Sequence, residues 1–383
     1  MKWVKGIFIG FFAFFIICMG FSTFNNKKEK SLIEGRALKQ FPAFSGEKLI
    51  QTEYLNTLSD AFSDQITGRD KMIRAYNWLI VDVLQQKWAG SIAIGKNKQL
   101  YQEPELITDE AAYEKEVKEC AELINKEAAK IKAAGSIFIY LNVPRKDVVE
   151  TKNLPDYYPD SEKDYDHLIS LLRSKLSDDV IFLDAKDIFE GKEHVYYSTD
   201  HHVNFTGQML IYHKLMSIVK EQFPDIEVKE LSDFRQKKRV IDGSFNRRIG
   251  YALTPEKEVL SVRPDFPYYA KRRSSKTAIF GGGKTYATAF MGGDYASTFV
   301  KTDKKEAPSI FISGSSYTNS LEALCTCSFS TMHSVDYRSN KSGKTLADYV
   351  QSEKPDYVVY LPNQSDKHFS LSTFKIHLGI SDN

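Results

Sequence analysis

Residues 308–325 read PSIFISGSSYTNSLEALC, and this stretch decides the fold. Its first part, PSIFISG, is a short apolar run rich in isoleucine and phenylalanine, which predicts a strand buried on both faces. The polar turn SGSSYTNS overlaps the end of this run, and LEALC then predicts a helix. A strand, a tight turn and a helix in this order are typical of α/β proteins, whose sites form at such turns.

Four other short runs are β-branched or aromatic in the same way: SIFIYLNV (136–143), VIFLDA (180–185), MHSVDY (332–337) and PDYVVYLP (355–362). The chain between and before them carries helical spacing at 107–134, 162–176, 206–222, 317–325 and 344–352. Strands that alternate with helices predict a mostly parallel sheet with helices on both faces. The segment 225–305 breaks this rhythm and is interpreted as an insertion of loops or small β elements between two core strands.

The N-terminal segment 6–24, GIFIGFFAFFIICMGFSTF, contains no charged residue. As a helix it would span about 28 Å, close to the thickness of a hydrocarbon core. Lys2 and Lys5 favour an N-terminus inside the cell, which predicts an uncleaved signal anchor; cleavage after the run is the alternative. The expected organisation is a cytoplasmic tip and anchor (1–24), a tether (25–45), an α/β domain (46–365) and a C-terminal tail (366–383). The soluble domain is expected on the extracytoplasmic side.

Composition excludes some functions. The 52 lysines and arginines nearly balance the 50 aspartates and glutamates, so no global attraction to nucleic acid is expected. GGGKT (281–285) lacks the first glycine of a phosphate-binding loop and does not follow a buried strand. Of the four cysteines, one lies in the apolar segment, and the other three form a poor disulfide framework and are interpreted as buried thiols.

A second polar loop, STDHHVNFTG (198–207), leads into the helical pattern from residue 206. A serine hydroxyl is a poor nucleophile until a base accepts its proton, and a histidine held by a carboxylate suits that task. Asp200 and His202 could supply both groups to a serine in the turn at 313–320. Taken alone, the residues leave two other interpretations open: metal ligands, or a helix cap with an ordinary surface histidine.

STDHHVNFTG resembles the signature of the DHHW protein family, and FISGSSYTNSLEAL (311–324) resembles the nucleophile turn of the same group. FMGGDYA (290–296) stands where these proteins carry a Gly-Gly-Asn segment, and the similarity follows most of residues 30–365 in order. The group is related to the alginate O-acetylation proteins and to other SGNH-hydrolase-like polysaccharide O-acetyltransferases. The resemblance therefore implies an SGNH-hydrolase-like three-layer sandwich.

Carried over residue by residue, the resemblance implies that Ser316 is the nucleophile, His202 the general base and Asp200 its orienting partner. It places the oxyanion donors at the N–H of Ser316 and at the N–H of Gly293 or Asp294. No cofactor and no metal is implied.

The resemblance also suggests residues that contact the substrate. These are Tyr317, beside the nucleophile, and Arg145 or Lys146 in VPRKD, where relatives have a similar Pro-x-Lys. Two departures from the family pattern matter. Val203 replaces a tryptophan, and Asp294 replaces an asparagine, whose side chain can donate to an oxyanion whereas an ionised aspartate cannot.

The function that the resemblance implies is O-acetyl transfer onto, or acetyl-ester hydrolysis of, a cell-surface polysaccharide by a membrane-anchored domain. Such proteins often work beside a membrane-bound O-acyltransferase that supplies acetyl groups. The alternative is an SGNH-like domain without turnover, serving as a scaffold or polysaccharide-binding subunit of an exopolysaccharide or biofilm assembly. The basic run Lys271–Arg273 could meet an acidic polymer or lipid headgroups, or be a solvated loop.

Overall fold

The computed structural model describes residues 2–31, 33, 36–250, 257–272, 278–362 and 369–380. Contacts between residues divide the chain into two units. The first consists of residues 1–93 and 244–253, and the second of residues 94–243 and 254–383. This division differs from the sequence-based boundaries, because residues 46–93 group with the N-terminal segment rather than with the α/β domain.

A seven-stranded sheet forms the centre of the second unit, in the order β10-β11-β13-β12-β14-β6-β7. Its strands are β6 (Ile137–Asn142), β7 (Val180–Asp184), β10 (Ala270–Arg272), β11 (Ser297–Thr302), β12 (Ser309–Ser313), β13 (Thr331–Val335) and β14 (Tyr357–Tyr360). The five strands expected from the sequence pair in parallel, from β13 across to β7. The prediction of a mostly parallel α/β sheet is therefore confirmed.

Side chains alternate between two hydrophobic cores, one on each face of the sheet. In β12, Ile310 and Ile312 belong to one core and Phe311 to the other. In β6, Ile139 and Phe138 divide in the same way. Each of these side chains is almost completely buried, which explains why the strands read as continuous apolar runs rather than as alternating ones.

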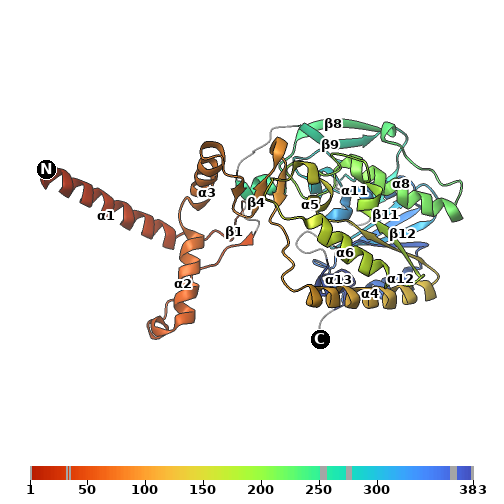
Figure 1. The fold of residues 1–383 in the computed structure, drawn as a ribbon, viewed down its shortest axis with the longest axis horizontal. Coiled ribbons are helices and arrows are strands. Elements are labelled where there is room, and N and C mark those ends of the chain that lie inside the picture. The colour runs from red at the N-terminus through yellow and green to blue at the C-terminus, as the bar shows by residue number, and fades with distance from the viewer. Residues whose placement is uncertain are drawn as a thin grey trace. The chain divides into compact units, whose positions relative to one another are not determined.

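Helices cover both faces of this sheet (Figure 1). One core is closed by α8 (Phe205–Gln222) and α11 (Asn319–Cys325). The other is closed by α4 (Glu110–Ala133), α6 (Ser161–Arg173), α12 (Leu346–Glu353) and α13 (Leu371–His377). The segment expected as a C-terminal tail thus contains a helix, and Phe374 of that helix is completely buried.

The segment expected as an insertion contributes to the sheet itself. β11 pairs antiparallel with β13, and β10 pairs antiparallel with β11, so both extend the sheet beyond its parallel part. Ahead of them, β8 (Phe234–Val240) and β9 (Lys257–Pro264) form a separate antiparallel pair. The remaining short elements of the second unit are β5 (Leu100–Gln102), α5 (Lys146–Val149), α7 (Ala185–Ile188) and α10 (Tyr286–Ala289).

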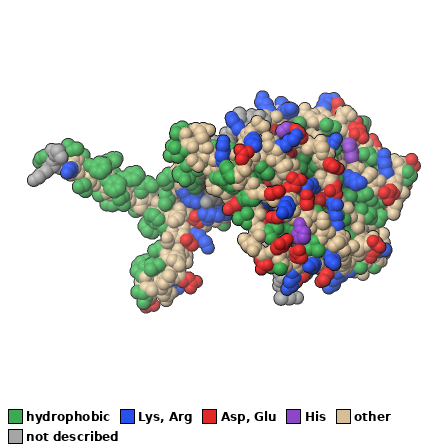
Figure 2. All heavy atoms as spheres, in the orientation of Figure 1, with side chains coloured by type: hydrophobic (Ala, Val, Ile, Leu, Met, Phe, Trp, Pro, Cys, Tyr) green, Lys and Arg blue, Asp and Glu red, His purple; other side chains and the backbone are tan. Residues whose placement is uncertain are grey.

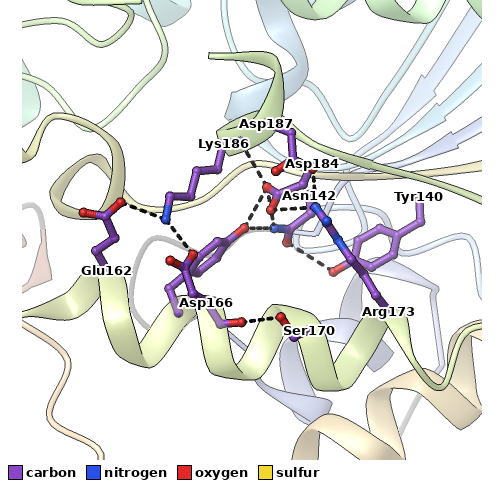
Figure 3. Close-up of polar contacts among 10 residues, drawn as sticks. Tyr140, Asn142, Glu162, Asp166, Ser170, Arg173, Asp184, Lys186 and Asp187 are labelled. Atoms are coloured by element: carbon purple, nitrogen blue, oxygen red, sulfur yellow. Dashed lines mark hydrogen bonds and ion pairs between the residues drawn. The ribbon is translucent and has the colours of Figure 1, made fainter. Parts of the chain in front are cut away.

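A polar network ties α6 to the ends of β6 and β7 (Figure 3). The Tyr165 hydroxyl donates to Asp184 Oδ1 at 2.7 Å, and the Asn142 amide donates to the same carboxylate at 3.3 Å. An Nη of the partly exposed Arg173 lies 3.4 Å from Asp184 Oδ2. Burial raises the pKa of the Asp184 carboxyl, and the hydrogen bonds from Tyr165 and Asn142 partly offset that effect. Because its acceptors are filled by protein donors, this network is structural.

The first unit begins with α1 (Lys2–Phe24). Among the described residues, the helical stretch Trp3–Phe24 alone is long and apolar enough to cross a membrane, with a mean hydropathy of 2.3. Its side chains form an almost wholly hydrophobic surface (Figure 2). The other elements of this unit are β1 (Lys30–Ser31), β2 (Arg36–Ala37), α2 (Thr52–Gln65), α3 (Arg69–Trp78), a π-helical turn (Leu79–Val83), β3 (Trp88–Ala89), β4 (Ile92–Ile94) and α9 (Ser244–Ile249).

The described part of the segment expected as a tether packs against α2. Arg36 forms a two-pronged ion pair with Asp64, with N···O distances of 2.6 and 2.8 Å. The Lys39 N–H donates to the same carboxylate at 2.8 Å. These contacts, with Arg36 first, lower the pKa of Asp64 to about 2. This segment is therefore ordered on α2 rather than extended.

Candidate active site

The predicted nucleophile turn lies at the carboxyl end of β12, the central strand of the sheet. The strand ends at Ser313, and Ser316 begins a 3₁₀ turn that continues into α11. Gly314 is required at the start of the turn, because a Cβ there would lie 2.4 Å from Thr318 Cγ2 and 3.0 Å from the Leu361 carbonyl oxygen. Ser315 is buried, whereas Ser316 is partly exposed, so Ser316 is the serine that a substrate could reach.

The Asp-His-His loop is held as a narrow turn ahead of α8. Tyr196 and Val203 form an isolated antiparallel bridge, and the Tyr197 N–H donates to the His202 carbonyl at 3.1 Å. Asn204 caps α8 by accepting the Gly207 N–H at 3.0 Å. Val203, which replaces the family tryptophan, is completely buried. The loop is therefore tightly packed despite this replacement.

The two loops meet. His202 Nε2 lies 2.9 Å from Ser316 Oγ, and His202 Nδ1 lies 2.7 Å from Asp200 Oδ1. The His202 N–H also donates to Asp200 Oδ1, at 3.1 Å. Asp200 is 2 % exposed and His202 7 %, so solvent competes little for these hydrogen bonds. The structure thus brings together a hydroxyl, an imidazole and a carboxylate in the order that proton transfer from the hydroxyl requires.

Aromatic rings fix the plane of the His202 imidazole. The Tyr286 ring stacks on it with a centroid distance of 4.1 Å and an interplanar angle of 12°. The Tyr317 ring lies 4.9 Å away, and its hydroxyl donates to the His201 carbonyl at 3.2 Å. His201 thus contributes its backbone carbonyl and a ring contact with His202. Tyr317 is 4 % exposed, and its ring packs against the histidines. The predicted substrate contact through Tyr317 is therefore not supported.

The ligand-type atoms of Asp200, His201 and His202 lie within 4.8 Å of one another, so the cluster has the spacing of a metal site. Both ring nitrogens of His202 are, however, within hydrogen-bond distance of Asp200 and Ser316. A metal bound through His202 would have to displace one of these partners. The arrangement therefore favours proton transfer over metal binding.

A small cavity lies beside the serine turn and is lined in part by Gly293, Asp294, Ser315 and Asn319. The Asn319 side-chain amide donates to Asp294 Oδ1 at 2.7 Å. The loop that carries Asp294 is shaped by left-handed backbone at Met291, with φ of 57°, and at Gly292, with φ of 74°. Asp294 therefore accepts a hydrogen bond from the Asn319 side-chain amide. The sequence did not predict this role of Asn319, because an asparagine in the first turn of a helix is an ordinary residue.

Lys146 is not at the surface. Its Nζ donates to Gln99 Oε1 at 2.9 Å and to the carbonyl oxygens of Leu100, Tyr197 and Ser198 at 3.1, 2.8 and 2.8 Å. The residue is 3 % exposed, and burial lowers the pKa of its amine. The predicted contact between Lys146 and substrate is therefore wrong, because every donor direction is used inside the protein. Lys146 instead fixes the chain just before Asp200.

Arg145 is buried as well, at 3 % exposure. Its Nε lies 3.0 Å from Asp147 Oδ1, and an Nη donates to the Glu103 carbonyl at 2.6 Å. Its suggested role in binding substrate is corrected for the same reason. The motif VPRKD shows that two cations follow a strand, but the direction of their side chains also depends on carbonyl groups far away in sequence.

Helix α13 contacts the end of β12 and the start of the serine turn. The Ser313 hydroxyl donates to the His377 carbonyl, and the His377 side chain interacts with the Gly314 backbone. His377 is 1 % exposed. Burial, with the nearby Arg338 charge, lowers the pKa of its imidazole to about 4, although Asp336 opposes this shift. His377 is thus a buried neutral base under the turn that carries Ser316.

We expect Lys146→Met to lower the free energy of unfolding by at least about 2 kcal/mol, since it removes a charged donor that four buried acceptors share. Lys152→Met is the matched control, because Lys152 is exposed and pairs with Glu193 on the surface; its effect should stay below about 0.5 kcal/mol. Urea denaturation of both variants measures the difference. Equal stabilities would remove the structural role assigned to Lys146.

His377 should make the free energy of unfolding depend on pH in a specific way. Its imidazole takes up a proton at about pH 4 when folded and near 6.5 when unfolded, so its contribution to stability is complete above pH 6.5 and is lost as pH falls toward 4. Unfolding free energies of wild type and His377→Gln at pH 4–7 measure this. We expect wild type to lose up to about 1.4 kcal/mol per pH unit more than the variant in that window. Parallel pH profiles would contradict the assignment.

Comparison with solved structures shows the same fold. Bacillus cereus PatB1 is 19 % identical, with a TM-score of 0.61 over 73 % of this chain and 98 % of that chain. PatB1 with a sulfonyl adduct gives 18 % identity, a TM-score of 0.60, and coverage of 74 % and 98 %. A DHHW family protein from Eubacterium siraeum DSM 15702 gives 19 % identity, a TM-score of 0.57, and coverage of 76 % and 96 %.

The sequence itself was also compared with curated proteins and with protein families. No curated protein matches it. The family described as SGNH hydrolase-like domain, acetyltransferase AlgX, matches residues 92–304, which is more than half of the chain. The predicted resemblance and the predicted SGNH-like fold are confirmed. The chain belongs to the SGNH hydrolase-like acetyltransferase AlgX family.

Proposed function

We propose that this protein is an O-acetyltransferase that modifies a cell-surface polysaccharide through an acyl-enzyme on Ser316. The observation that carries the proposal is the continuous hydrogen-bonded chain from Asp200 through His202 to Ser316, with spacings of 2.7 and 2.9 Å. Membership of an acetyltransferase family supports acetyl as the transferred group. The resemblance of the Asp-His-His loop and the serine turn to polysaccharide O-acetyltransferases makes a polysaccharide the expected acceptor.

In the proposed reaction Ser316 Oγ attacks the carbonyl carbon of an acetyl donor, and His202 Nε2 accepts the hydroxyl proton. Asp200 holds the Nδ1–H and stabilises the imidazolium that forms. The tetrahedral intermediate collapses to acetyl-Ser316, and the proton on His202 passes to the leaving group. A sugar hydroxyl then loses its proton to His202 and attacks the acetyl carbonyl, which regenerates Ser316 and leaves the sugar acetylated. With water in place of the sugar, the same steps give hydrolysis.

The oxyanion needs donors, and Asp294 cannot supply one from its side chain when ionised. We assign this role to the Ser316 N–H, to the backbone N–H of Gly293 or Asp294, and to the second amide hydrogen of Asn319. The Asn319 amide is oriented by its 2.7 Å hydrogen bond to Asp294, and both residues line the cavity beside the turn. In this assignment Asp294 orients the Asn319 amide as a donor. It does not itself take over the donor role of the family asparagine.

The setting of the reaction is proposed from the apolar helix. Anchored by Trp3–Phe24, with its N-terminus inside, the protein would hold its catalytic unit on the outer face of the membrane. Both an emerging polysaccharide and a membrane-bound O-acyltransferase that supplies acetyl groups would be within reach there. The sequence-based boundaries of anchor, tether and domain stay a prediction within this proposal.

A second function is a polysaccharide-binding scaffold without turnover. The observation that favours it is the carboxylate of Asp294 at the cavity where the oxyanion would form, since a negative charge there opposes the transition state. The two functions make opposite predictions for the reactivity of Ser316.

We expect a fluorosulfonyl reagent to label wild type and Ser315→Ala but not Ser316→Ala, because Ser316 Oγ lies 2.9 Å from His202 Nε2 whereas Ser315 is buried. A sulfonyl reagent is chosen because PatB1 forms a sulfonyl adduct. Release of p-nitrophenol from p-nitrophenyl acetate should fall at least about 10³-fold in Ser316→Ala and in His202→Ala. Intact-mass spectrometry and absorbance measure the two effects. If wild type is no more reactive than Ser316→Ala, the scaffold function is correct.

The assignment of Asn319 has its own test. Asn319→Ala should lower kcat for p-nitrophenyl acetate about 10²–10³-fold, the usual cost of removing one oxyanion donor. Asp294→Asn returns the residue of the family pattern, keeps an acceptor for Asn319 and removes the charge, so its kcat should equal or exceed that of wild type. Unchanged kcat in Asn319→Ala would show that the backbone alone holds the oxyanion.

A further inference from the structure

The carboxyl end of α1 is fixed to the turn between α2 and α3. A hydrogen bond of 2.8 Å joins the hydroxyls of Ser22 and Thr67, and the Thr67 N–H donates to Thr23 Oγ1 at 3.3 Å. The ring centroid of Phe24, the last residue of α1, lies 6.0 Å from that of Phe62 in α2. Helix α2 therefore ends, and α3 begins, at the point where the apolar helix ends.

Both helices that meet at this turn expose large apolar side chains. In α3 and the π-helical turn that continues it, four of these residues are spaced at intervals of four, three and four positions, which places them on one side of the helix. Helix α2 exposes two more, about two turns apart. These residues, which we call the apolar stripes of α2 and α3, are each between 40 % and 61 % exposed: Leu55, Phe62, Met72, Tyr76, Leu79 and Val83.

The segment before α2 adds to this apolar surface. Phe44 and Ile50 are 84 % and 90 % exposed, respectively. Single exposed apolar residues are common in soluble proteins, but large exposed apolar surfaces mark contacts with a protein or with a membrane. We therefore expect the stripes and the two residues before them to be covered in the working protein.

The membrane is the cover that the structure favours. Phe24 is exposed on α1 and contacts Phe62, so the apolar surface of the membrane-spanning candidate continues onto the stripe of α2. Lys27 and Lys30, just beyond α1, are exposed at the level where lysines meet lipid phosphate groups. Tyr76, in the stripe of α3, is of a residue type that is enriched at the membrane–water boundary.

Charged residues keep these helices out of the hydrocarbon. Glu53 and Asp60 in α2 are exposed, and helical spacing places them on the side away from Leu55 and Phe62. Arg74 in α3 is also exposed, on the side away from the stripe of that helix. A helix that needs lipid on one side and water on the other lies along the boundary between them.

We propose that α2 and α3 are interfacial helices, whose apolar stripes enter the lipid boundary around the end of α1. This inference rests on the proposed anchoring of the protein by α1. The partner is the region of a bilayer just below the lipid headgroups, and exposed lysines beyond α1 contact the phosphates. Three helices would then hold the first unit on the bilayer at a fixed height, whereas α1 alone would leave it free to swing on the chain that follows.

The test uses full-length protein in vesicles of phosphatidylcholine and phosphatidylglycerol, with and without lipids that carry a nitroxide near the headgroup. A fluorophore is attached to single introduced cysteines in a Cys18→Ser background, since the other three cysteines are buried. We expect the nitroxide to quench the fluorophore at Leu55→Cys or Leu79→Cys at least about threefold more than at matched positions on the polar sides. These control positions are Asp60→Cys and Arg74→Cys.

The native Cys18 separates failure of this inference from failure of the anchor, because it is exposed on α1. Labelled in wild type, it should be quenched by lipids that carry the nitroxide lower on the acyl chain. If Cys18 is quenched but the stripe positions respond like their controls, the interfacial helices are overturned and the anchor stands. If Cys18 is not quenched, both are overturned. A stripe fluorophore that loses water contact only at high protein-to-lipid ratio, without quenching by nitroxide, would show that a second copy covers the stripe, which also overturns the proposal.

Discussion

A hydrogen bond of 2.9 Å between His202 and Ser316 joins two loops that lie 114 positions apart in the sequence. It can form only because β12 is central and parallel to its neighbours, so that its carboxyl end meets the loops that follow other strands on one edge of the sheet. The Asp-His-His loop reaches that edge because Lys146, just after β6, holds the carbonyls of Tyr197 and Ser198. Sheet topology and one buried amine thus bring the base to the hydroxyl.

Two buried cations that follow β6 are both satisfied by groups of the protein itself. Lys146 has four protein acceptors around its ammonium group, and its role is structural. Arg145 is equally buried, pairs with Asp147 and donates to the Glu103 carbonyl. Both arrangements fix the chain that follows β6, because a buried charge is tolerated only where its hydrogen bonds are made within the protein.

The sequence predicted the five parallel strands because strands buried on both faces read as continuous apolar runs, which β12 and β6 show directly. The pattern placed a serine turn and an Asp-His pair beside predicted helices, and the resemblance to the DHHW family, rather than the pattern, singled out Ser316, His202 and Asp200. It failed for Lys146 and Arg145, because a motif states the residue type and not the distant carbonyls that enclose it. It missed Asn319 and His377 for a similar reason: their partners, Asp294 and the Gly314 backbone, lie on other elements.

The position of α13 has a consequence for the order of events in biosynthesis. The turn that carries Ser316 rests on His377, which is translated 61 residues later by its number in the chain, and the Ser313 hydroxyl bonds the carbonyl of that same residue. A growing chain in which β12 has already left the ribosome still lacks α13, the helix that contacts the serine turn. The turn that carries Ser316 therefore reaches its final geometry only after α13 has been translated and has packed against it.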